Sequence, residues 1–426
     1  MGKKLYLVYG LVIIGIFALI HLLFPPEWST WITWTNEMFA GTRPEHIGLF
    51  ILGAFFFFAF VILWGINFLA SFGKVKYPPG SENHTPPISV IIPALNEEKV
   101  IGNTLETYHL SAYPKDKLEL VVVASGSTDK TLEICEQYQK HLNIVIVTEP
   151  QHKKGKPAAL NLGLKHASND ILCVYDADNH VQSNTLNALI RPFYDANIAV
   201  TIGPTQLRNR DVNWWTKAVF LDFSYMCAMG LYFEIRHRLG RGLWIMGRNY
   251  AIRRSVLEEF GGWNEDALTE DLHLSLQLSK AGKKYAHIPA ATSLEITPTT
   301  WEGIKLQRKR WVGGYKQNME SSMELDKRSV ILRNLGMLHN IHLVNYSVGA
   351  IGMAVIFGLI GDFYIMVVCL GVFVIAFGIL VNAVRKYGEG RYRCLLAYPW
   401  YFVLMLYMFI IQFKDFSNLE WDKTEK

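Results

Sequence analysis

The stretch ILCVYDAD, residues 171–178, decides how the rest of the chain is interpreted. Its uninterrupted apolar run is typical of a buried strand in a parallel sheet, and it ends in two carboxylates, Asp176 and Asp178. At the carboxyl end of a strand in an open α/β sheet, such side chains face the crevice where ligands bind. Two hard oxygen ligands on one side of the chain suit Mg²⁺ or Mn²⁺ and a bridging diphosphate. An Asx turn that merely closes the strand is the alternative interpretation.

The composition indicates a mixed architecture. The 426 residues are 50% hydrophobic and 13% aromatic, too apolar for an ordinary soluble enzyme, yet 19% are charged, too many for a pure membrane bundle. The net charge of +5 is small, and the basic residues cluster beside apolar segments, so we interpret them as membrane topology signals and expect no nucleic-acid partner. The five cysteines show no CxxC spacing, which argues against a zinc site or a disulfide framework.

Two long apolar runs lie near the amino terminus. Residues 5–23 follow Lys3 and Lys4 and are long enough to cross a hydrocarbon core. We favour a retained helix over a signal peptide, because the run is long for a signal sequence and no small-residue cleavage site follows it. Residues 47–70 form the second run. Residues 1–76 are therefore predicted to form two transmembrane helices joined by an outer loop.

After a polar, Pro-rich linker, the pattern changes to short β-rich runs that alternate with amphipathic helical stretches. This alternation is typical of a doubly wound α/β domain, which we place in the cytosol at residues 77–299. We expect strands at residues 88–93, 118–123, 144–148, 171–178 and 199–202. We expect helices between them at residues 99–109, 130–140 and 157–167.

The remaining chain leads back to the bilayer. Residues 300–335 are predicted to hold amphipathic interface helices, and residues 336–426 to hold the C-terminal transmembrane helices. The loop between the last two spans is basic, which predicts that it is cytosolic and that the carboxyl terminus lies outside. The last span contains Pro399 and Gln412, so an interfacial position is the alternative. The three expected spans are 341–360, 363–384 and 397–413.

Three turns at the same predicted sheet edge carry candidate donor-binding residues. Glu97 lies in an Asn-Glu-Glu turn after the first strand, and Ser125 and Asp129 lie in a Ser-Gly-Ser-Thr-Asp turn after the second. Lys156 ends a basic, glycine-containing turn before a helix, a plausible diphosphate clamp. The alternatives are helix caps for the first two turns and an exposed charged loop for the third.

Two later motifs carry candidate catalytic and acceptor-binding residues. Glu270 and Asp271 precede an amphipathic helix, where a carboxylate serves either as a cap or as a general base. In the sequence QRKRW, Gln307, Arg310 and Trp311 are spaced to share one helical face. Arg310 can bind a phosphate and Trp311 can stack on a sugar ring, while a merely interfacial helix is the alternative.

Together these motifs, in this order, resemble those of the family 2 membrane glycosyltransferases, which include the cellulose, chitin, hyaluronan and poly-N-acetylglucosamine synthases. The resemblance covers residues 88–311 and the flanking spans. It implies a GT-A fold, an α/β, doubly wound and Rossmann-like domain, inserted between transmembrane α-helices. It also implies a nucleotide-sugar donor, usually a UDP-sugar, bound through Mg²⁺ or Mn²⁺.

The same resemblance implies roles for individual residues. Asp178 matches the metal ligand, Asp176 a contact to the donor diphosphate or sugar, and Asp271 the catalytic base. Glu97 and Lys156 match positions near the nucleotide. The residues that would hold the diphosphate and the acceptor sugar are Glu270, Gln307, Arg310 and Trp311.

The turn after the second predicted strand departs from the family pattern. Most members have an acidic pair there, whereas this chain has Ala124 and Ser125, so the usual carboxylate that contacts uracil is missing. Ser125 or Asp129 can substitute for it. The identity of the nucleotide base therefore stays open.

The resemblance predicts a membrane-embedded inverting glycosyltransferase that uses UDP-Glc or UDP-GlcNAc to build and export a β-linked polysaccharide. Its expected partners are the donor, a carbohydrate or lipid acceptor, membrane lipids and an accessory export subunit. Transfer of one sugar to a lipid is the alternative. A transporter or receptor with a regulatory nucleotide-binding domain is a rival, but charged residues within the predicted spans are nearly absent. A catalytically silent scaffold is disfavoured by the intact set of acids.

Overall fold

A computed structural model describes residues 83–151, 155–238, 245–323 and 363–411, with a few more between 351 and 359. The chain divides into two units, Met1–Phe68 with Ser347–Phe377, and Leu69–Tyr346 with Gly378–Lys426. The predicted spans at 5–23 and 47–70, and most of the span at 341–360, lie outside the described residues, as do residues 152–154 of the basic turn. The fold and the site described below belong to the second unit.

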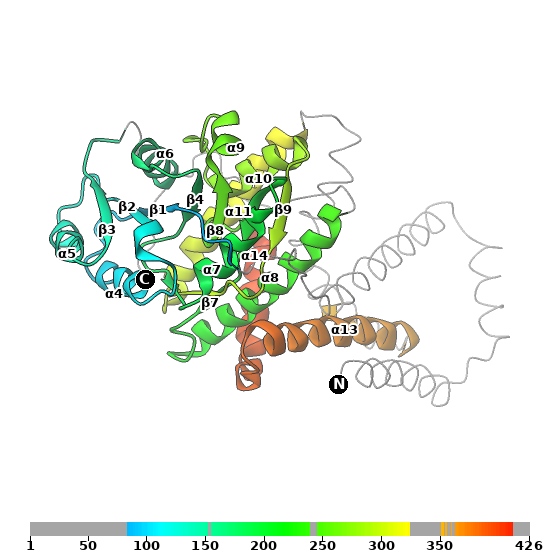
Figure 1. Cartoon of the computed structure of the whole chain (residues 1–426). Helices are drawn as coiled ribbons and strands as arrows, with labels where there is room; N and C mark the ends of the chain where they lie inside the picture. Colours follow the sequence, from blue (N-terminus) through cyan, green and yellow to red (C-terminus); the bar gives the residue numbers. More distant parts are fainter. Residues whose placement is uncertain are drawn as a thin grey trace. The chain divides into compact units, whose positions relative to one another are not determined.

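A seven-stranded sheet forms the centre of this unit, with the strand order β3-β2-β1-β4-β8-β6-β9 (Figure 1). The first four of these strands are parallel, as are β6 and β9, whereas β8 lies antiparallel between β4 and β6. The strands are β1 Ile88–Pro93, β2 Leu118–Val123, β3 Asn143–Val147, β4 Ile171–Val174, β6 Ile198–Ile202, β8 Tyr250–Arg253 and β9 Lys284–His287. The predicted α/β domain is thus confirmed as a mixed sheet, and β8 was not predicted.

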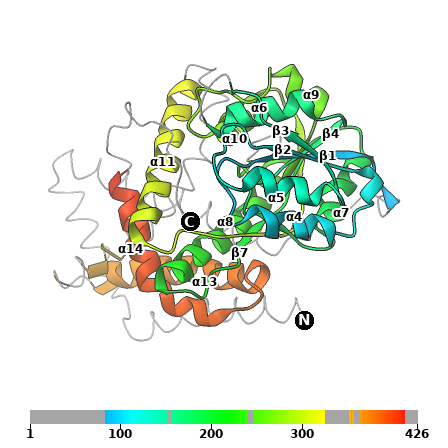
Figure 2. The ribbon, with the colours of Figure 1, turned by 90° about the vertical axis from the view of Figure 1, so that its left-hand side faces the viewer.

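Helices cover both faces of the sheet. Every residue of β2 and of β4 is buried, which explains why β4 is apolar throughout and β2 is apolar except for Glu119. The buried Glu119 carboxylate accepts a 2.8 Å hydrogen bond from the Ser168 hydroxyl. Helix α6 packs across β1 and β2, while α4 and α5 pack together on the other face (Figure 2). The helices of this part are α4 Ile101–His109, α5 Thr131–Tyr138, α6 Lys156–His166, α7 Thr185–Ile190, α9 Arg254–Glu259 and α10 Glu270–Lys280.

A second, three-stranded sheet extends the loop that follows Asp178. It has the order β5-β10-β7, from β5 His180–Val181, β10 Ser293–Glu295 and β7 Thr205–Leu207. Strand β10 pairs antiparallel with β5 and parallel with β7. The acid-bearing end of β4 is therefore held beside Glu295, which lies far away in the sequence.

Three helices of the second unit pack beside the large sheet: α8 Trp214–Arg238, α11 Trp301–Met323 and α14 Tyr398–Ile411. Helix α8 packs against α14 and the 3₁₀ helix η4 Tyr392–Ala397, and α11 packs against both α10 and α14. Two tryptophan stacks join them, Trp214 on Trp400 at 4.8 Å and Trp215 on Trp301 at 4.4 Å between ring centroids. Helix α11 lies within residues 300–335, where amphipathic helices were predicted.

The predicted spans at 363–384 and 397–413 correspond to α13 Phe363–Tyr387 and to η4 with α14. Within the part of the chain that the structure describes, no helix combines the length and the hydropathy that a membrane span requires.

Candidate active site

A cavity of about 770 Å³ opens at the carboxyl ends of β1 and β4. Its walls come from the turns after these strands, the start of α6, the loop before β8, the start of α10 and one face of α11. It brings together almost all the residues that the sequence predicted for the site: Glu97, Asp129, Lys156, Asp176, Asp178, Glu270, Asp271, Gln307, Arg310 and Trp311. Ser125 is buried and does not line the cavity.

The turns after β1 and β2 are bound to each other. The Thr128 N–H donates a 2.8 Å hydrogen bond to Oδ1 of Asn96, whose φ is +52°. Asp129 accepts 3.0 Å hydrogen bonds from the N–H groups of Glu98 and Thr131. Burial is the largest single effect and raises the pKa of Asp129, but the hydrogen bonds from the Thr131 hydroxyl and from the N–H groups of Glu98 and Thr131 together outweigh it and hold the pKa below its usual value. Asp129 therefore fixes the shape of the wall as well as lining it, although the residue at the N-cap position of α5 is Lys130, which makes no side-chain cap hydrogen bond.

Lys156 lies at the first position of α6 and connects three parts of the site. Its Nζ lies 2.6 Å from Oδ1 of Asp176, 2.8 Å from the carbonyl oxygen of Gly247 and 3.6 Å from Oε1 of Glu270. Burial alone would lower the pKa of Lys156, but the charges of Asp176 and Glu270 raise it above its usual value. Lys156 is therefore a permanent cation on the cavity wall.

Asp176 and Asp178 lie in a turn and not in the extended strand itself. Strand β4 ends at Val174, and the Asn179 N–H donates a 3.0 Å hydrogen bond to the carbonyl oxygen of Asp176. This bond joins two backbone groups, so it is an ordinary turn and not an Asx turn. The turn leaves both carboxylates on the cavity wall.

The donor set on this wall suits a hard divalent cation. Among the described residues no group of three or more His, Cys, Asp or Glu side chains is arranged to hold a metal ion. Mg²⁺, however, is commonly bound by one or two carboxylates together with substrate phosphates and water. Asp176 and Asp178, which share one wall, fit that requirement.

Arg248 is a cation of the site that the sequence analysis missed. It lies two residues before β8, its side chain is 13% exposed, and it forms an ion pair with Glu295 of β10. Burial opposes its charge, but Glu295, Asp176 and Asp178 outweigh this effect and raise its pKa. The cavity thus holds Arg248 and Lys156 among its acids before any ligand binds.

Asn249 explains how β8 is held between β4 and β6, both of which run antiparallel to it. Its φ is +51°, and its amide group is fully buried. The Asn249 Oδ1 accepts a 2.7 Å hydrogen bond from the Tyr175 hydroxyl, and Nδ2 donates to the carbonyl oxygens of Pro204 and Ala291, each at 2.7 Å. These bonds join four segments around the carboxyl end of β4. The Gly-Arg-Asn run at 247–249 was the available signal.

Asp271 lies in the first turn of α10, and its environment suits a proton acceptor. Burial and the neighbouring charge of Glu270 raise its pKa to about 7, although Lys156 and the 2.8 Å hydrogen bond from the Leu272 N–H oppose the shift. A carboxyl group with a pKa near neutrality is suited to general acid–base chemistry. Gly247 packs closely against it, since a Cβ there would lie 2.9 Å from Oδ2.

Helix α11 is docked onto the loop that carries the acids. The Asn318 Nδ2 donates a 3.0 Å hydrogen bond to Oγ1 of Thr269, and Gln317 Nε2 donates one of 3.0 Å to the Asp266 carbonyl oxygen. Gly314 permits the close approach, because a Cβ there would lie 2.4 Å from Cγ2 of Thr269. The position of α11 relative to Asp271 is therefore fixed by direct contacts.

The predicted face of α11 points to the cavity. Gln307 is buried and Trp311 half-buried. Burial lowers the pKa of Arg310, and the facing charges of Glu270 and Asp176 partly offset this effect. Arg310 therefore shares the acidic region with Lys156.

Comparison with known proteins agrees with this geometry. The family model described as "Glycosyltransferase like family 2" matches residues 86–314, which include every residue discussed in this cavity. The chain is 34% identical over 266 residues to a protein described as "probable glycosyltransferase YdaM" from Bacillus subtilis, covering 60% of this chain and 61% of the relative.

Two further relatives differ in product. The chain is 28% identical over 307 residues to a beta-monoglucosyldiacylglycerol synthase from Nostoc sp., covering 70% and 62% of the two chains. It is 26% identical over 261 residues to a poly-beta-1,6-N-acetyl-D-glucosamine synthase from Staphylococcus aureus, covering 61% and 60%. The matched part thus spans about six tenths of the length of these curated relatives.

The fold also matches a solved structure, the mannosyltransferase PcManGT from Pyrobaculum calidifontis in complex with GDP-Man and Mn²⁺. The TM-score is 0.55 at 20% sequence identity, covering 85% of this chain and 97% of the other. At this identity the match shows a shared GT-A-like fold.

Proposed function

This chain belongs to the glycosyltransferase-like family 2, whose model matches more than half of the sequence. We propose that this glycosyltransferase transfers a sugar from a nucleotide sugar to an acceptor hydroxyl with inversion of the anomeric configuration. The observation that carries the proposal is Asp271, a carboxylate with a pKa of about 7 in the same cavity as Lys156, Asp176, Asp178 and Arg310. This combination supplies a base and charge stabilisation in one place.

The proposed step begins with Asp271. Its carboxylate takes the proton of the acceptor hydroxyl, and the oxygen attacks the anomeric carbon of the donor. The bond between that carbon and the diphosphate oxygen breaks, and the nucleoside diphosphate leaves with the negative charge. Lys156 and Arg310, already placed among the acids, stabilise this charge as it develops. Attack from the side opposite the leaving group inverts the anomeric configuration.

The donor is proposed to lie along the turns after β1 and β2. Glu97 and Asp129 face the nucleoside end of the cavity, and Asp176 contacts the diphosphate or the sugar. Asp178, with Asp176 beside it, would hold Mg²⁺ or Mn²⁺, which when bound neutralises the diphosphate. PcManGT, whose fold is similar, was solved with GDP-Man and Mn²⁺. UDP-Glc and UDP-GlcNAc are our first candidates for the donor.

We propose a β-linked polysaccharide as the product, as made by the staphylococcal relative. Transfer of a single sugar to a lipid is the second candidate. The apolar side of the cavity favours this second candidate. That side is lined by residues of α8, α11 and α14, namely Met226, Val312, Tyr401 and Met408.

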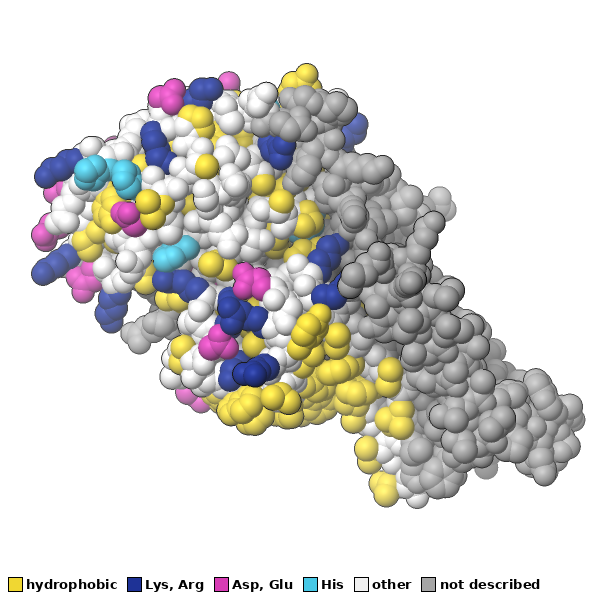
Figure 3. Space-filling view, turned by 60° about the horizontal axis from the view of Figure 1, so that its bottom comes forward, with side chains coloured by type: hydrophobic (Ala, Val, Ile, Leu, Met, Phe, Trp, Pro, Cys, Tyr) yellow, Lys and Arg dark blue, Asp and Glu magenta, His cyan; other side chains and the backbone are white. Residues whose placement is uncertain are grey.

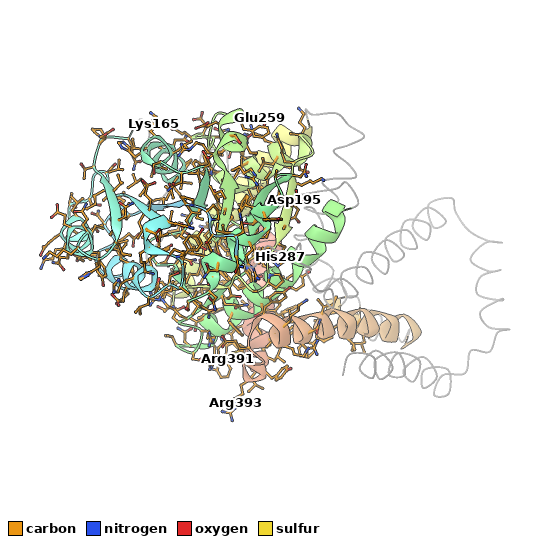
Figure 4. All side chains as sticks on the ribbon, in the orientation of Figure 1. Lys165, Asp195, Glu259, His287, Arg391 and Arg393 are labelled. Atoms are coloured by element: carbon orange, nitrogen blue, oxygen red, sulfur yellow. The ribbon has the colours of Figure 1, made fainter. Side chains whose placement is uncertain are left out.

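We further propose that the protein is an integral membrane protein with this domain in the cytosol, and that export uses the membrane part with an accessory subunit. The apolar runs of the sequence support this proposal. A second support is an apolar surface beside Lys and Arg side chains (Figure 3). Its exposed residues include Trp214, Tyr392 and Leu396, and Arg391 and Arg393 lie near it (Figure 4). Apolar side chains next to cations suit the interface of an anionic bilayer.

The experiment is an incubation of the full-length protein in detergent with radiolabelled nucleotide sugars and Mn²⁺ or Mg²⁺. Products are separated by size and by extraction into organic solvent. A large water-soluble product would support the polysaccharide, and a small extractable product the glycolipid. If the protein neither transfers nor hydrolyses any nucleotide sugar in the panel, the proposed function is wrong.

A further inference from the structure

A buried ion pair joins α8 to α11 at the cavity. Nη2 of Arg308 lies 2.8 Å from Oδ2 of Asp222, and their side chains are only 1% and 8% exposed. Both residues line the cavity. Burying two charges is costly, and an apolar pair of similar volume is often at least as stable. Stability alone is therefore a weak reason for an ion pair at this place.

The pair determines the surroundings of Trp311. The guanidinium of Arg308 lies over the Trp311 ring, 4.2 Å from its centroid, one helical turn away on α11. The ring of Phe223, the residue after Asp222 on α8, lies 6.4 Å from the Trp311 ring. Asp222 thus fixes the guanidinium that covers one face of the indole, and its neighbour contacts the same indole.

Phe223 also contacts a second cation of the site. The Arg248 guanidinium lies 5.1 Å from the centroid of the Phe223 ring while it pairs with Glu295. Asp222 and Phe223 therefore organise two cations that would otherwise repel each other, Arg308 on the side of Trp311 and Arg248 on the side of the acids. This part of α8 therefore contacts both Arg308, beside Trp311, and Arg248, beside the acids.

We propose that Asp222 and Arg308 are positioning residues for the acceptor. Their ion pair holds Trp311 in the orientation in which its ring stacks on the acceptor, so that the acceptor hydroxyl lies near Asp271. The inference rests on the proposed function and on the acceptor contact that the family resemblance implies for Trp311. It predicts that the pair controls transfer to an acceptor and leaves hydrolysis of the donor by water almost unchanged.

The test separates this role from a purely structural one. In the double variant Asp222→Val/Arg308→Met both charges are removed together, so no buried charge is left unpaired. We expect a melting temperature close to that of the wild type. Donor hydrolysis should stay within about twofold, whereas transfer should fall roughly tenfold to hundredfold, because a reactant misplaced by about 1 Å loses that much rate. An equal change in transfer and hydrolysis would overturn the inference.

A single substitution gives a second test if the double variant does not fold. In Arg308→Lys the charge opposite Asp222 is kept, but the planar group that covers the indole is lost. We expect the same fall in the ratio of transfer to hydrolysis. The matched control is Arg210→Lys, because Arg210 lies 5.6 Å from the Phe220 ring and 3.2 Å from Glu389 but does not line the cavity. Its ratio should stay unchanged; a ratio unchanged in Arg308→Lys as well would contradict the inference.

The assay uses UDP-glucose or UDP-GlcNAc, whichever the wild type hydrolyses faster, with octyl β-glucoside and diacylglycerol as acceptors, in a detergent without a sugar headgroup. Transfer by the wild type tests the proposed function itself. A wild type that transfers to neither acceptor and also forms no polysaccharide would contradict both proposals. A wild type that transfers, with an unchanged ratio in the variants, would overturn only the role of Asp222 and Arg308.

Discussion

The Lys156 ammonium lies 2.6 Å from a carboxylate oxygen of Asp176 and donates a 2.8 Å hydrogen bond to the carbonyl oxygen of Gly247. One side chain thereby joins the start of α6, the turn after β4 and the loop before β8. A cation at this junction holds the acids in place before the donor arrives and faces the proposed diphosphate afterwards.

Replacing this cation should impair both structure and donor use. In Lys156→Met, the Asp176 carboxylate loses its counterion, which should cost roughly 1 to 3 kcal/mol, between the values typical of exposed and buried pairs. The KM for the nucleotide sugar should rise, since the cation near the diphosphate is lost. Thermal unfolding and donor titrations measure these effects. Lys283→Met is the control, because its pair with Glu259 lies at the surface and away from the cavity. Equal effects of the two variants would contradict the role of Lys156.

Transfer should depend on pH through Asp271. Since burial and Glu270 raise the pKa of Asp271 to about 7, the required carboxylate form is depleted below that pH. The rate of transfer should therefore fall about tenfold per pH unit below 7 and level off above it. In Glu270→Gln, one cause of the raised pKa is removed, so the midpoint should move to lower pH. The measurement is kcat against pH at saturating donor; a midpoint that stays in place, or moves upward, would speak against this electrostatic account.

Gly247 should be intolerant of a side chain because of its contact with Asp271. Gly247 has a φ of +72°, and a Cβ would lie 2.9 Å from the Asp271 carboxylate, so Gly247→Ala should displace that carboxylate. Gly282→Ala is matched to it, because Gly282 has a φ of +67° and nothing lies within 4 Å of a Cβ there. Both variants should lose roughly 1 to 3 kcal/mol of stability from backbone strain. Only Gly247→Ala should lose transfer, and equal activity of the two folded variants would refute the contact as a constraint on the base.

The metal dependence should be traceable to Asp178. We expect EDTA to stop transfer and Mn²⁺ or Mg²⁺ to restore it. Asp178→Asn should raise the Mn²⁺ concentration for half-maximal transfer by roughly tenfold or more, since changes even outside the immediate ligands reach that size. Calorimetric titration of Mn²⁺ in the presence of UDP measures the same change without turnover. Asp195→Asn, at a position that does not line the cavity, should bind Mn²⁺ like the wild type. Identical Mn²⁺ affinities of the two variants would exclude Asp178 as a ligand.

The predictable parts of the fold are those that local sequence patterns determine. Strands β1 and β2 begin and end as predicted because each is a short run rich in Ile, Leu and Val, interrupted only by Ser89 or Glu119 and bounded by turn residues. Glu97, Asp176 and Asp178 were placed at one edge because the carboxyl ends of parallel strands meet there, and the cavity does contain them.

The parts that were missed depend on contacts between distant segments. Strand β8 has only four residues, and its antiparallel insertion depends on the buried amide of Asn249. The partner of Arg248 is Glu295, on a strand of the small sheet, and no local pattern joins the two. Ser125 shows the opposite error, because a polar residue after a strand was predicted to face the donor but is buried and does not line the cavity.

The central claim is that Asp271 is the base that activates the acceptor, and Asp271→Asn tests it most directly. The asparagine keeps the shape of the side chain but cannot take the proton. Transfer of radiolabelled sugar and binding of the nucleotide sugar are measured on the same preparation of the wild type and the variant. The account predicts loss of transfer by at least about a hundredfold with nearly unchanged donor affinity. Turnover equal to that of the wild type in Asp271→Asn would contradict it.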